Sequence, residues 1–220
     1  MPRSLRNYQT GSCVHLMQRG DNHSAVFHDD DERHHYLGLL GAACLKHGCD
    51  LHAYVLMTNH VHLLVTIHYR NAQSLMMKDL AQFTAHWQHR RHGSSGTMWD
   101  GKYHASEIDS EAYLLTCQRY IELNPVRAGM VDFPGGYRWS SYRANAEGKE
   151  NPLLMRHAVF EGLGKDACER EQAYRALFDM PLSEKDLLRI RYAIQHEAAL
   201  RKPVTRGPAQ GPDPAMRARG

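Results

Sequence analysis

The sequence predicts an α+β fold in which an antiparallel sheet carries two helices on one face. Three observations predict it. Short apolar runs that are typical of buried strands alternate with longer segments in which apolar residues recur at helical spacing. These segments follow the order strand, helix, strand, strand, helix, strand, helix, which is the split βαβ arrangement of antiparallel sheets. A chain of 220 residues also has the length of one such domain with an appendage.

Residues 51–67, with the sequence LHAYVLMTNHVHLLVTI, form the centre of the predicted sheet. Two runs rich in Val, Leu and Ile, residues 53–57 and 61–67, flank the polar pair Thr58-Asn59. Asn tolerates the backbone of a tight turn, so this stretch predicts a hairpin. We expect its two strands to be adjacent and central in the sheet, because both runs have the composition of buried strands.

The segment before the hairpin predicts a strand and a helix. Residues 12–19, SCVHLMQR, are a strand candidate that is followed by polar turn residues. The three aspartates at residues 29–31 suit an N-cap and the acidic first turn of a helix. This helix should end near His47, because Gly48 is a typical stop signal.

Two further helices are predicted after the hairpin. Residues 71–92 carry apolar residues at helical spacing and end in a basic segment. Residues 97–108 predict a loop or short strand followed by a strand. Ser110 then caps a third helix, which ends or kinks at Asn124 because Pro125 disfavours helical geometry in the residue before it.

The rest of the chain predicts a helical extension and a tail. Residues 138–142, RWSSY, should form a loop against the core, and residues 149–152 a linker. Helical spacing is clearest over residues 169–178 and 183–200. The final stretch, residues 201–220, is rich in Pro, Gly and Arg, which predicts disorder. The expected division is into a folded domain, a helical extension and a tail, over residues 1–148, 149–200 and 201–220.

Composition narrows the functional class. The formal net charge is +3 at pH 7 and the sequence pI is about 8.6, which is compatible with binding nucleic acid. The five cysteines form no C-x-x-C pair, so we expect reduced thiols and a cytoplasmic location. We expect no signal peptide, since the N-terminal residues lack its apolar segment. No apolar run approaches the length of a membrane span, so no membrane partner is expected.

Two pairs of residues suggest chemistry. His60 and His62 alternate along a predicted strand and therefore point to one face, side by side, as half of a metal site. The chain contains 16 His, so a single H-x-H pair also arises by chance. Tyr120 and Asn124 lie four residues apart, which places their side chains on one face of the third helix.

These four residues can form one site if the third helix faces the histidines. Two imidazoles and an amide oxygen would hold a divalent ion and leave positions open, which suits Mg²⁺ or Mn²⁺. The ion would polarise a phosphodiester, and Tyr120 would stand one helical turn away, placed to attack phosphorus. The alternative is that Tyr120 is a core aromatic residue and Asn124 a helix cap.

Four motifs in a fixed order resemble a known family. They are HAYVLMTNHVHLLV from residue 52, WDGKY from residue 99, YIELNPVRAG from residue 120 and WSSY from residue 139. Over residues 2–146 the chain is similar to the REP-associated tyrosine transposases, which are single-tyrosine HUH transposases of bacterial insertion sequences. The resemblance implies a ferredoxin-like domain that cleaves and rejoins single-stranded DNA at hairpin-forming repeats. It also implies a 5′-phosphotyrosine intermediate and a requirement for Mg²⁺ or Mn²⁺.

The resemblance implies roles for single residues. His60 and His62 match the metal ligands of the family. Tyr120 matches its nucleophile, and Asn124 matches the third ligand position. The residues expected to bind DNA are basic or aromatic and lie in three places: Arg3, Arg6 and Arg19 near the N-terminus, Arg90 and Arg91 at the end of the second helix, and Lys102 and Tyr103 in the second motif. The expected partner is single-stranded DNA with a hairpin, bound by a monomer or a homodimer in the bacterial nucleoid.

Two positions depart from the family pattern. Thr58 stands where the family usually has Pro, and Asp21 stands where it usually has Asn. Asp21 adds a negative charge near the expected phosphate path, but neither change touches the metal ligands or the nucleophile. Three functions remain open: an active transesterase, a domesticated regulator that binds hairpins without recombining them, and a metal-dependent phosphodiesterase that uses water. A covalent adduct on DNA would separate the first from the other two.

Overall fold

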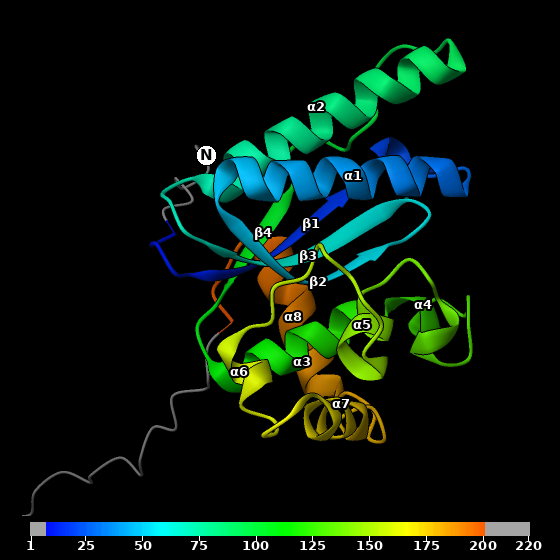
Figure 1. Ribbon diagram of the computed structural model, residues 1–220. Coiled ribbons are helices and arrows are strands. Elements are labelled where there is room, and N and C mark those ends of the chain that lie inside the picture. The colour runs from blue at the N-terminus through cyan, green and yellow to red at the C-terminus, as the bar shows by residue number, and fades with distance from the viewer. Residues whose placement is uncertain (1–7, 201–220) are drawn as a thin grey trace, which may run out of the picture.

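The computed structural model describes residues 8–200 and confirms an α+β fold with one antiparallel sheet (Figure 1). Its strands are β1 (Cys13–Arg19), β2 (Cys49–Leu56), β3 (His60–Ile67) and β4 (His104–Ile108). They lie in the order β2-β3-β1-β4, and each neighbouring pair is antiparallel. Because β3 lies between β1 and β2, the structure is the predicted split βαβ, or ferredoxin-like, arrangement.

The hairpin predicted in residues 51–67 is present, but only one of its strands is central. β2 and β3 pair from Cys49 opposite Ile67 to Leu56 opposite Val61. β3 has a neighbour on each side, whereas β2 lies at the edge of the sheet. The prediction that both strands are central is therefore wrong for β2. The apolar run of β2 reflects burial of both its faces, which an edge strand also has when other elements cover it.

The outer edge of β2 is covered by segments that return from later in the chain. Three backbone hydrogen bonds join these segments to β2. The N–H of Leu56 donates to the oxygen of Trp139 at 2.9 Å. The N–H of Ser141 donates to the oxygen of Tyr54 at 3.0 Å, and that of Met155 to the oxygen of Leu51 at 2.8 Å. The segment 138–142, predicted as a loop against the core, thus runs along the sheet. The backbone groups of β2 find partners on both sides although only one side has a strand.

Helices α1 (Asp30–His47) and α2 (Ala72–His92) cover one face of the sheet, as predicted (Figure 1). α1 begins after Asp29, whose side chain accepts a hydrogen bond from the backbone N–H of Glu32. It ends at Gly48, which has a φ of 62° in the left-handed region that glycine favours. The sequence signals therefore locate both ends of α1 to within about one residue.

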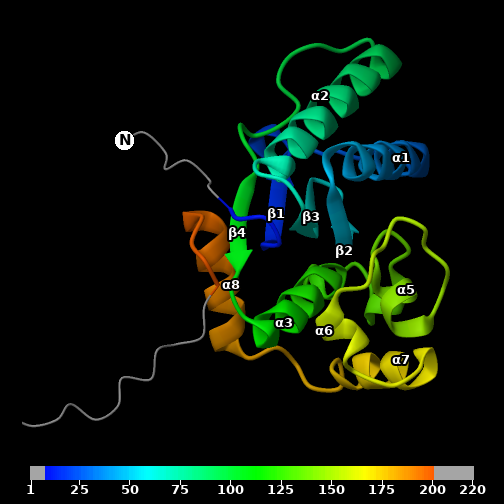
Figure 2. The same ribbon diagram turned by 60° about the vertical axis from the view of Figure 1, so that its left-hand side comes forward.

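The opposite face of the sheet is covered by α3 (Glu111–Glu122) and by later helices (Figure 2). These are α4 (Asn124–Arg127), α5 (Tyr142–Glu147), α6 (Ala158–Glu161), α7 (Ala167–Ala176) and α8 (Glu184–His196), and short 3-10 helices lie at Asp21–His23 and Pro134–Gly136. α4 follows α3 directly and has Pro125 in its first turn, where proline is tolerated. Between residues 8 and 200, no helix is long and apolar enough to cross a membrane.

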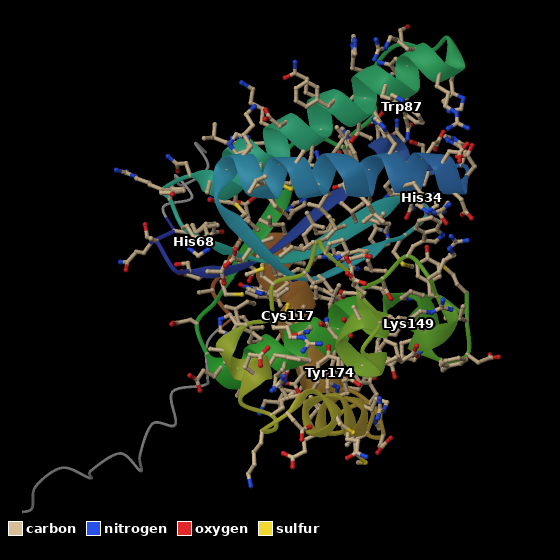
Figure 3. The ribbon with its side chains drawn as sticks, viewed as in Figure 1. His34, His68, Trp87, Cys117, Lys149 and Tyr174 are labelled. Carbon is tan, nitrogen blue, oxygen red and sulfur yellow. The ribbon has the colours of Figure 1, made fainter. Side chains whose placement is uncertain are left out.

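Glu122, the last residue of α3, joins the later helices to the sheet. Its buried carboxyl group accepts three hydrogen bonds. The donors are Ser141 Oγ at 2.6 Å, Asn145 Nδ2 at 2.9 Å and Tyr174 Oη at 2.7 Å. Burial raises the pKa of Glu122 to about 7. Asn145 lies in α5 and Tyr174 in α7 (Figure 3), so three helices meet at one carboxyl group.

The packing of the later helices does not decide whether the chain divides into a domain and an extension at residue 148. Among the helices of residues 149–200, α8 packs against β4 and β1, α6 against α3, and α7 against α5 and α6, on the side of the sheet that α3 covers (Figure 2). The domain boundary at residue 148 therefore stays a prediction. The expected disordered tail, residues 201–220, lies outside the residues that the structure describes.

Tyr174→Phe is expected to lower the free energy of unfolding by ~1–3 kcal/mol, because it leaves a buried carboxyl group with one donor fewer. The ring itself can stay packed against Phe160 and Phe178. Chemical denaturation followed by circular dichroism measures the change. Tyr192→Phe on α8 is the matched control, since Tyr192 is 60% exposed and should change stability by less than ~0.5 kcal/mol. Equal effects of the two substitutions would contradict the role given to Glu122.

Candidate catalytic site

His60 and His62 lie at the start of β3 and point to the face of the sheet that α3 covers. Their ring centroids are 5.1 Å apart, and the rings are perpendicular at 89°. The antiparallel register places Arg19 of β1 opposite His60. Strand alternation thus brings two imidazoles and one guanidinium group to the same edge of this face.

Each of the two imidazoles is oriented through its Nδ1 atom. His60 Nδ1 lies 2.7 Å from Asn59 Oδ1, and His62 Nδ1 lies 2.9 Å from His15 Nε2. These contacts use Nδ1 of both rings and leave Nε2 as the nitrogen for an ion. Histidines that bind metals have this arrangement, in which one nitrogen is held by a neighbour and the other faces the ion.

The histidines of the site are neutral at physiological pH. Burial is the main cause in each case, and it lowers the pKa of His15 to about 3 and that of His60 to about 4. The pKa of His62 is also well below its usual range, because the ring is buried and lies beside other basic groups. Neutral imidazole is the form that binds a metal ion.

Tyr120 of α3 packs directly against these rings. Its side chain is buried, and its ring centroid lies 5.8 Å from that of His62, with the two rings perpendicular at 90°. The His15 ring meets Tyr120 edge-on at 6.0 Å. The face of α3 that carries Tyr120 therefore packs against the histidines, as the four-residue site requires. The sequence alone did not decide this.

Arg127 packs against the Tyr120 ring and forms hydrogen bonds to both Tyr120 and Asn124. The guanidinium carbon is 4.0 Å from the Tyr120 ring centroid. One guanidinium nitrogen donates to the backbone oxygen of Tyr120 at 3.1 Å, and another donates to Asn124 Oδ1 at 2.9 Å. Asn124 Nδ2 in turn donates to the backbone oxygens of Tyr120 and Ile121, which fixes the orientation of its amide.

The side chains of His60, His62 and Asn124 offer ligand types that a divalent ion can use. They are two neutral imidazole nitrogens and one amide oxygen, a set without thiolates that leaves positions for water and phosphate oxygens. Asn124 Oδ1 has a second lone pair beyond the one that Arg127 uses. Asn124 and His62 both contact Tyr120. That the Asn124 amide and the two imidazoles come within coordination distance of one ion stays a prediction.

The expected DNA-binding residues are not all close to Tyr120. Arg19 is half-buried, opposite His60, and its charge contributes to the low pKa of that histidine. Arg3 and Arg6 lie outside the residues that the structure describes.

Arg90 and Arg91 lie at the end of α2, on the other side of the sheet from Tyr120. Arg91 forms ion pairs with Asp29 at 2.6 Å and Asp31 at 3.7 Å. These acids partly neutralise Arg91, which the sequence did not indicate.

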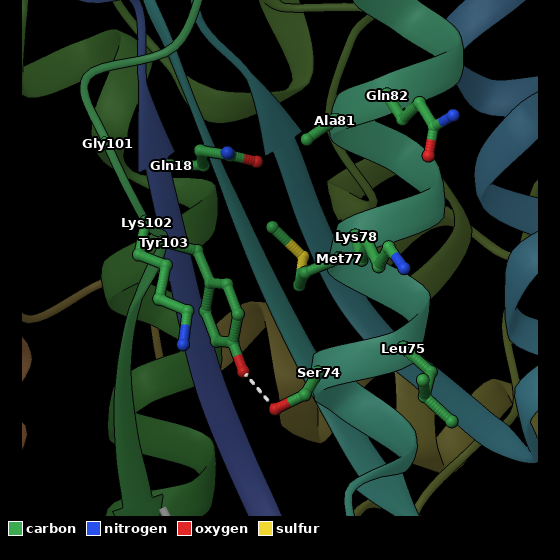
Figure 4. Close-up of a pocket in the computed structure, with 10 residues that line it drawn as sticks. All are labelled: Gln18, Ser74, Leu75, Met77, Lys78, Ala81, Gln82, Gly101, Lys102 and Tyr103. Atoms are coloured by element: carbon green, nitrogen blue, oxygen red, sulfur yellow. Dashed lines mark hydrogen bonds between the residues drawn. The ribbon is translucent and has the colours of Figure 1, made fainter.

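Lys102 and Tyr103 border a cavity of about 550 Å³ between α2 and the segment that leads into β4 (Figure 4). The Tyr103 hydroxyl lies 2.8 Å from Ser74 Oγ of α2. Gln18 of β1 is buried and points across the cavity towards α2, and within residues 8–200 its Oε1 atom has no hydrogen-bond partner. The cavity thus combines apolar walls with a buried amide and a lysine at its border.

The sequence reasoning missed two residues of the site, His15 and Arg127. His15 lies four residues before Arg19, so strand alternation places both on one face, but no motif in the sequence pointed to His15. Arg127 lies three residues after Asn124, within the YIELNPVRAG motif. The spacing indicates that Arg127 and Asn124 are neighbours on a helix, provided that the helix continues past Pro125.

Comparisons with known proteins show the family of this chain. A family model described as "Transposase IS200 like" matches residues 9–124. A solved structure of a REP-associated tyrosine transposase bound to a REP hairpin is 16% identical, with a TM-score of 0.53 over 72% of this chain and 93% of that one. A putative transposase from Deinococcus radiodurans R1 is 21% identical, with a TM-score of 0.40 over 55% of this chain and 95% of that one. A search of curated proteins found no match. The matched region includes the four strands, the histidine pair, Tyr120 and Asn124, and this chain belongs to the IS200-like transposase family.

Proposed function

We propose that this transposase is a metal-dependent transesterase of single-stranded DNA that cleaves and rejoins strands at hairpin-forming repeats. One observation supports it most: Tyr120 packs against the His62 ring while Arg127 lies 4.0 Å from the Tyr120 ring centroid. A tyrosine hydroxyl, a basic group and potential metal ligands are thus close together. The structural relative bound to a REP hairpin supports a hairpin substrate.

In the proposed reaction, Tyr120 is the nucleophile. Its oxygen forms a bond to phosphorus as its proton leaves, and the bond from phosphorus to the 3′ oxygen of the preceding nucleotide breaks. The products are a 5′-phosphotyrosine and a free 3′-hydroxyl group, which takes up a proton. Rejoining reverses these steps with another 3′-hydroxyl group. The phosphodiester energy stays in the covalent bond, whereas attack by water would lose it.

The surrounding residues stabilise the charges of this reaction. Arg127 can neutralise negative charge on the tyrosine oxygen and on the phosphate, and its bonds to Asn124 and the Tyr120 backbone hold it in position. A Mg²⁺ or Mn²⁺ ion held by His60, His62 and Asn124 would polarise the phosphodiester and neutralise charge in the transition state. His15 holds the His62 ring through its Nδ1 atom, which leaves Nε2 as the nitrogen that would bind the ion.

The DNA path that we propose runs over Arg19 and past Lys102 and Tyr103. Arg19 stands beside the histidines, and the cavity next to Lys102 and Tyr103 is large enough for part of an unpaired nucleotide. Other basic residues can neutralise further phosphates, namely Arg3, Arg6, Arg90 and Arg91. The cytoplasmic, nucleoid-associated location and the state as monomer or homodimer stay predictions.

The test is the formation of a covalent adduct with single-stranded oligonucleotides that carry the genomic repeats flanking the gene. With Mg²⁺, DNA labelled at its 3′ end should give a labelled protein band that survives denaturation. DNA labelled at its 5′ end should instead release a shorter free fragment with a 3′-hydroxyl group. Cleavage without an adduct would support a phosphodiesterase, and binding without cleavage would support a domesticated regulator.

Binding of the hairpin should weaken steeply with salt, because phosphate neutralisation releases counterions. The slope of log K against log salt should be roughly −0.7 for each neutralised phosphate on a single strand. Lys102→Ala should reduce the size of this slope by about 0.7, as measured by fluorescence anisotropy at several salt concentrations. Lys165→Ala, an exposed lysine between α6 and α7, is the control and should leave it unchanged. An affinity that is flat from low to physiological salt would contradict the proposed path.

A further inference from the structure

Three potential metal ligands meet on the side of the sheet that is remote from Tyr120. His28 lies just before α1, Glu32 in the first turn of α1 and His92 at the end of α2. Their ligand atoms all lie within 4.8 Å of one another. The centroids of the two imidazole rings are 5.2 Å apart.

We propose that His28, Glu32 and His92 bind a zinc ion at a second metal centre, separate from the His60 and His62 pair. Two imidazoles and one carboxylate are a zinc-binding set with a fourth position for water. The Glu32 carboxylate gives this set a negative charge that the set of His60, His62 and Asn124 lacks, and two imidazoles with one carboxylate are the ligands of known catalytic zinc sites. The ion would connect the beginning of α1 to the end of α2.

The distances in the cluster are close to those that zinc requires. Donor atoms of a tetrahedral zinc site with bonds of ~2.0–2.2 Å lie roughly 3.3–3.6 Å apart. His28 Nδ1 is 3.1 Å from Glu32 Oε2, and His92 Nε2 is 2.6 Å from Glu32 Oε1. Shifts of less than about 1 Å in the two histidine side chains would open the space for the ion. Both histidines are free to make them, since their side chains are 54% and 39% exposed.

The carboxylate of Glu32 is oriented as a metal-binding carboxylate should be. Its side chain is fully buried. Oε2 accepts hydrogen bonds from the backbone N–H of His28 at 2.7 Å and from Gln88 Nε2 at 3.4 Å. Oε1 faces His92 and Oε2 also faces His28, so both carboxylate oxygens border the space for the ion. Hydrogen bonds of this kind from neighbouring groups hold a ligating carboxylate in place and tune its affinity for the ion.

The carboxylates around the cluster favour a cation, whereas the two helix ends offset each other. Asp29 and Asp31 lie at the beginning of α1, and the partial negative charge at the carbonyl end of α2 meets the partial positive charge at the amide end of α1. Arg91 opposes the effect of the carboxylates, although it is paired with both aspartates. Without an ion, His28 and His92 are simply hydrogen-bonded to Glu32. The zinc-bound and zinc-free clusters differ in protonation. A ring nitrogen must be deprotonated to bind zinc, but it must carry a proton to donate a hydrogen bond to Glu32.

The test uses the full chain with His60→Ala and His62→Ala, so that the other histidine pair cannot bind the ion. After treatment with a chelator and buffer exchange, zinc chloride is titrated by calorimetry, and the melting temperature is measured in parallel. We expect one zinc ion per chain and a melting temperature that rises with zinc concentration. Adding His28→Ala and His92→Ala should abolish zinc binding and the rise in melting temperature. Adding His86→Ala and His89→Ala, which lie on α2 with His92, should leave both readouts unchanged.

A second variant covers the case in which the quadruple variant does not fold. His28→Gln changes a side chain that is more than half exposed, so it should keep the fold and lower zinc affinity by at least about tenfold. No zinc bound by the parent, or equal affinity in the His28→Gln protein, would overturn the proposal. These readouts do not involve DNA, so they stand apart from the test of the proposed function.

Discussion

Tyr120→Phe is expected to abolish the covalent adduct and to lower strand cleavage by at least about 10³-fold, while hairpin binding stays within about twofold. The substitution removes only the hydroxyl group. The phenyl ring can keep its contacts with His62 and with the Arg127 guanidinium group. The measurement is the adduct assay with 3′-labelled DNA, together with a binding titration of the same DNA.

Tyr113→Phe is the matched control for this experiment. Tyr113 lies seven residues earlier on α3, is equally buried, and its hydroxyl accepts a hydrogen bond from Arg189 of α8. Its position about two turns away, roughly 10 Å along the axis, assigns it to packing, so the adduct should persist. An adduct formed by the Tyr120→Phe protein would mean that another residue is the nucleophile. Cleavage without any adduct would mean that the protein is a hydrolase.

His60→Ala with His62→Ala is expected to lower cleavage by at least about 10²-fold, to the level that the unmodified protein shows with a chelator. Both substitutions remove nitrogen donors that the proposed Mg²⁺ or Mn²⁺ site needs. Cleavage rates are measured over a range of metal concentrations. The double variant should respond to neither ion.

The double variant should still fold, but with a lower free energy of unfolding. His62 is buried and shares a hydrogen bond with His15, so its loss should lower the free energy of unfolding by ~1–3 kcal/mol. Circular dichroism separates this effect from loss of activity. His68→Ala is the control, since His68 follows the far end of β3 (Figure 3) and pairs with Asp50. Metal-dependent cleavage that is unchanged in the double variant would reject the assignment of both histidines.

Much of the fold could be predicted because its signals are local. Asp29 caps α1 and Gly48 ends it, and both effects depend on the backbone within one turn. The interruption between α3 and α4 falls at Leu123, one residue before the predicted position, and Pro125 contributes to it because it has no N–H to donate to the preceding turn. The place of β2 at the edge could not be predicted, because a continuous apolar run shows only that both faces of a strand are buried.

The candidate site could be predicted only where spacing along one element sets the geometry. His60 and His62 share a face because strands alternate, and Tyr120 and Asn124 share one because helices repeat. The contact between His15 and His62 depends instead on how two strands pair, and no local pattern contains it. The cluster of His28, Glu32 and His92 depends in the same way on how α1 packs beside α2.

The covered edge of β2 bears on how two copies of this chain could associate. A sheet edge with unpaired N–H and C=O groups is a template for a strand of another molecule. In this chain those groups already bind the backbone near Trp139, Ser141 and Met155. A second copy could extend the sheet past β2 only after those segments detach. A homodimer of this transposase would therefore not form by joining two sheets through β2 unless the chain first opened there.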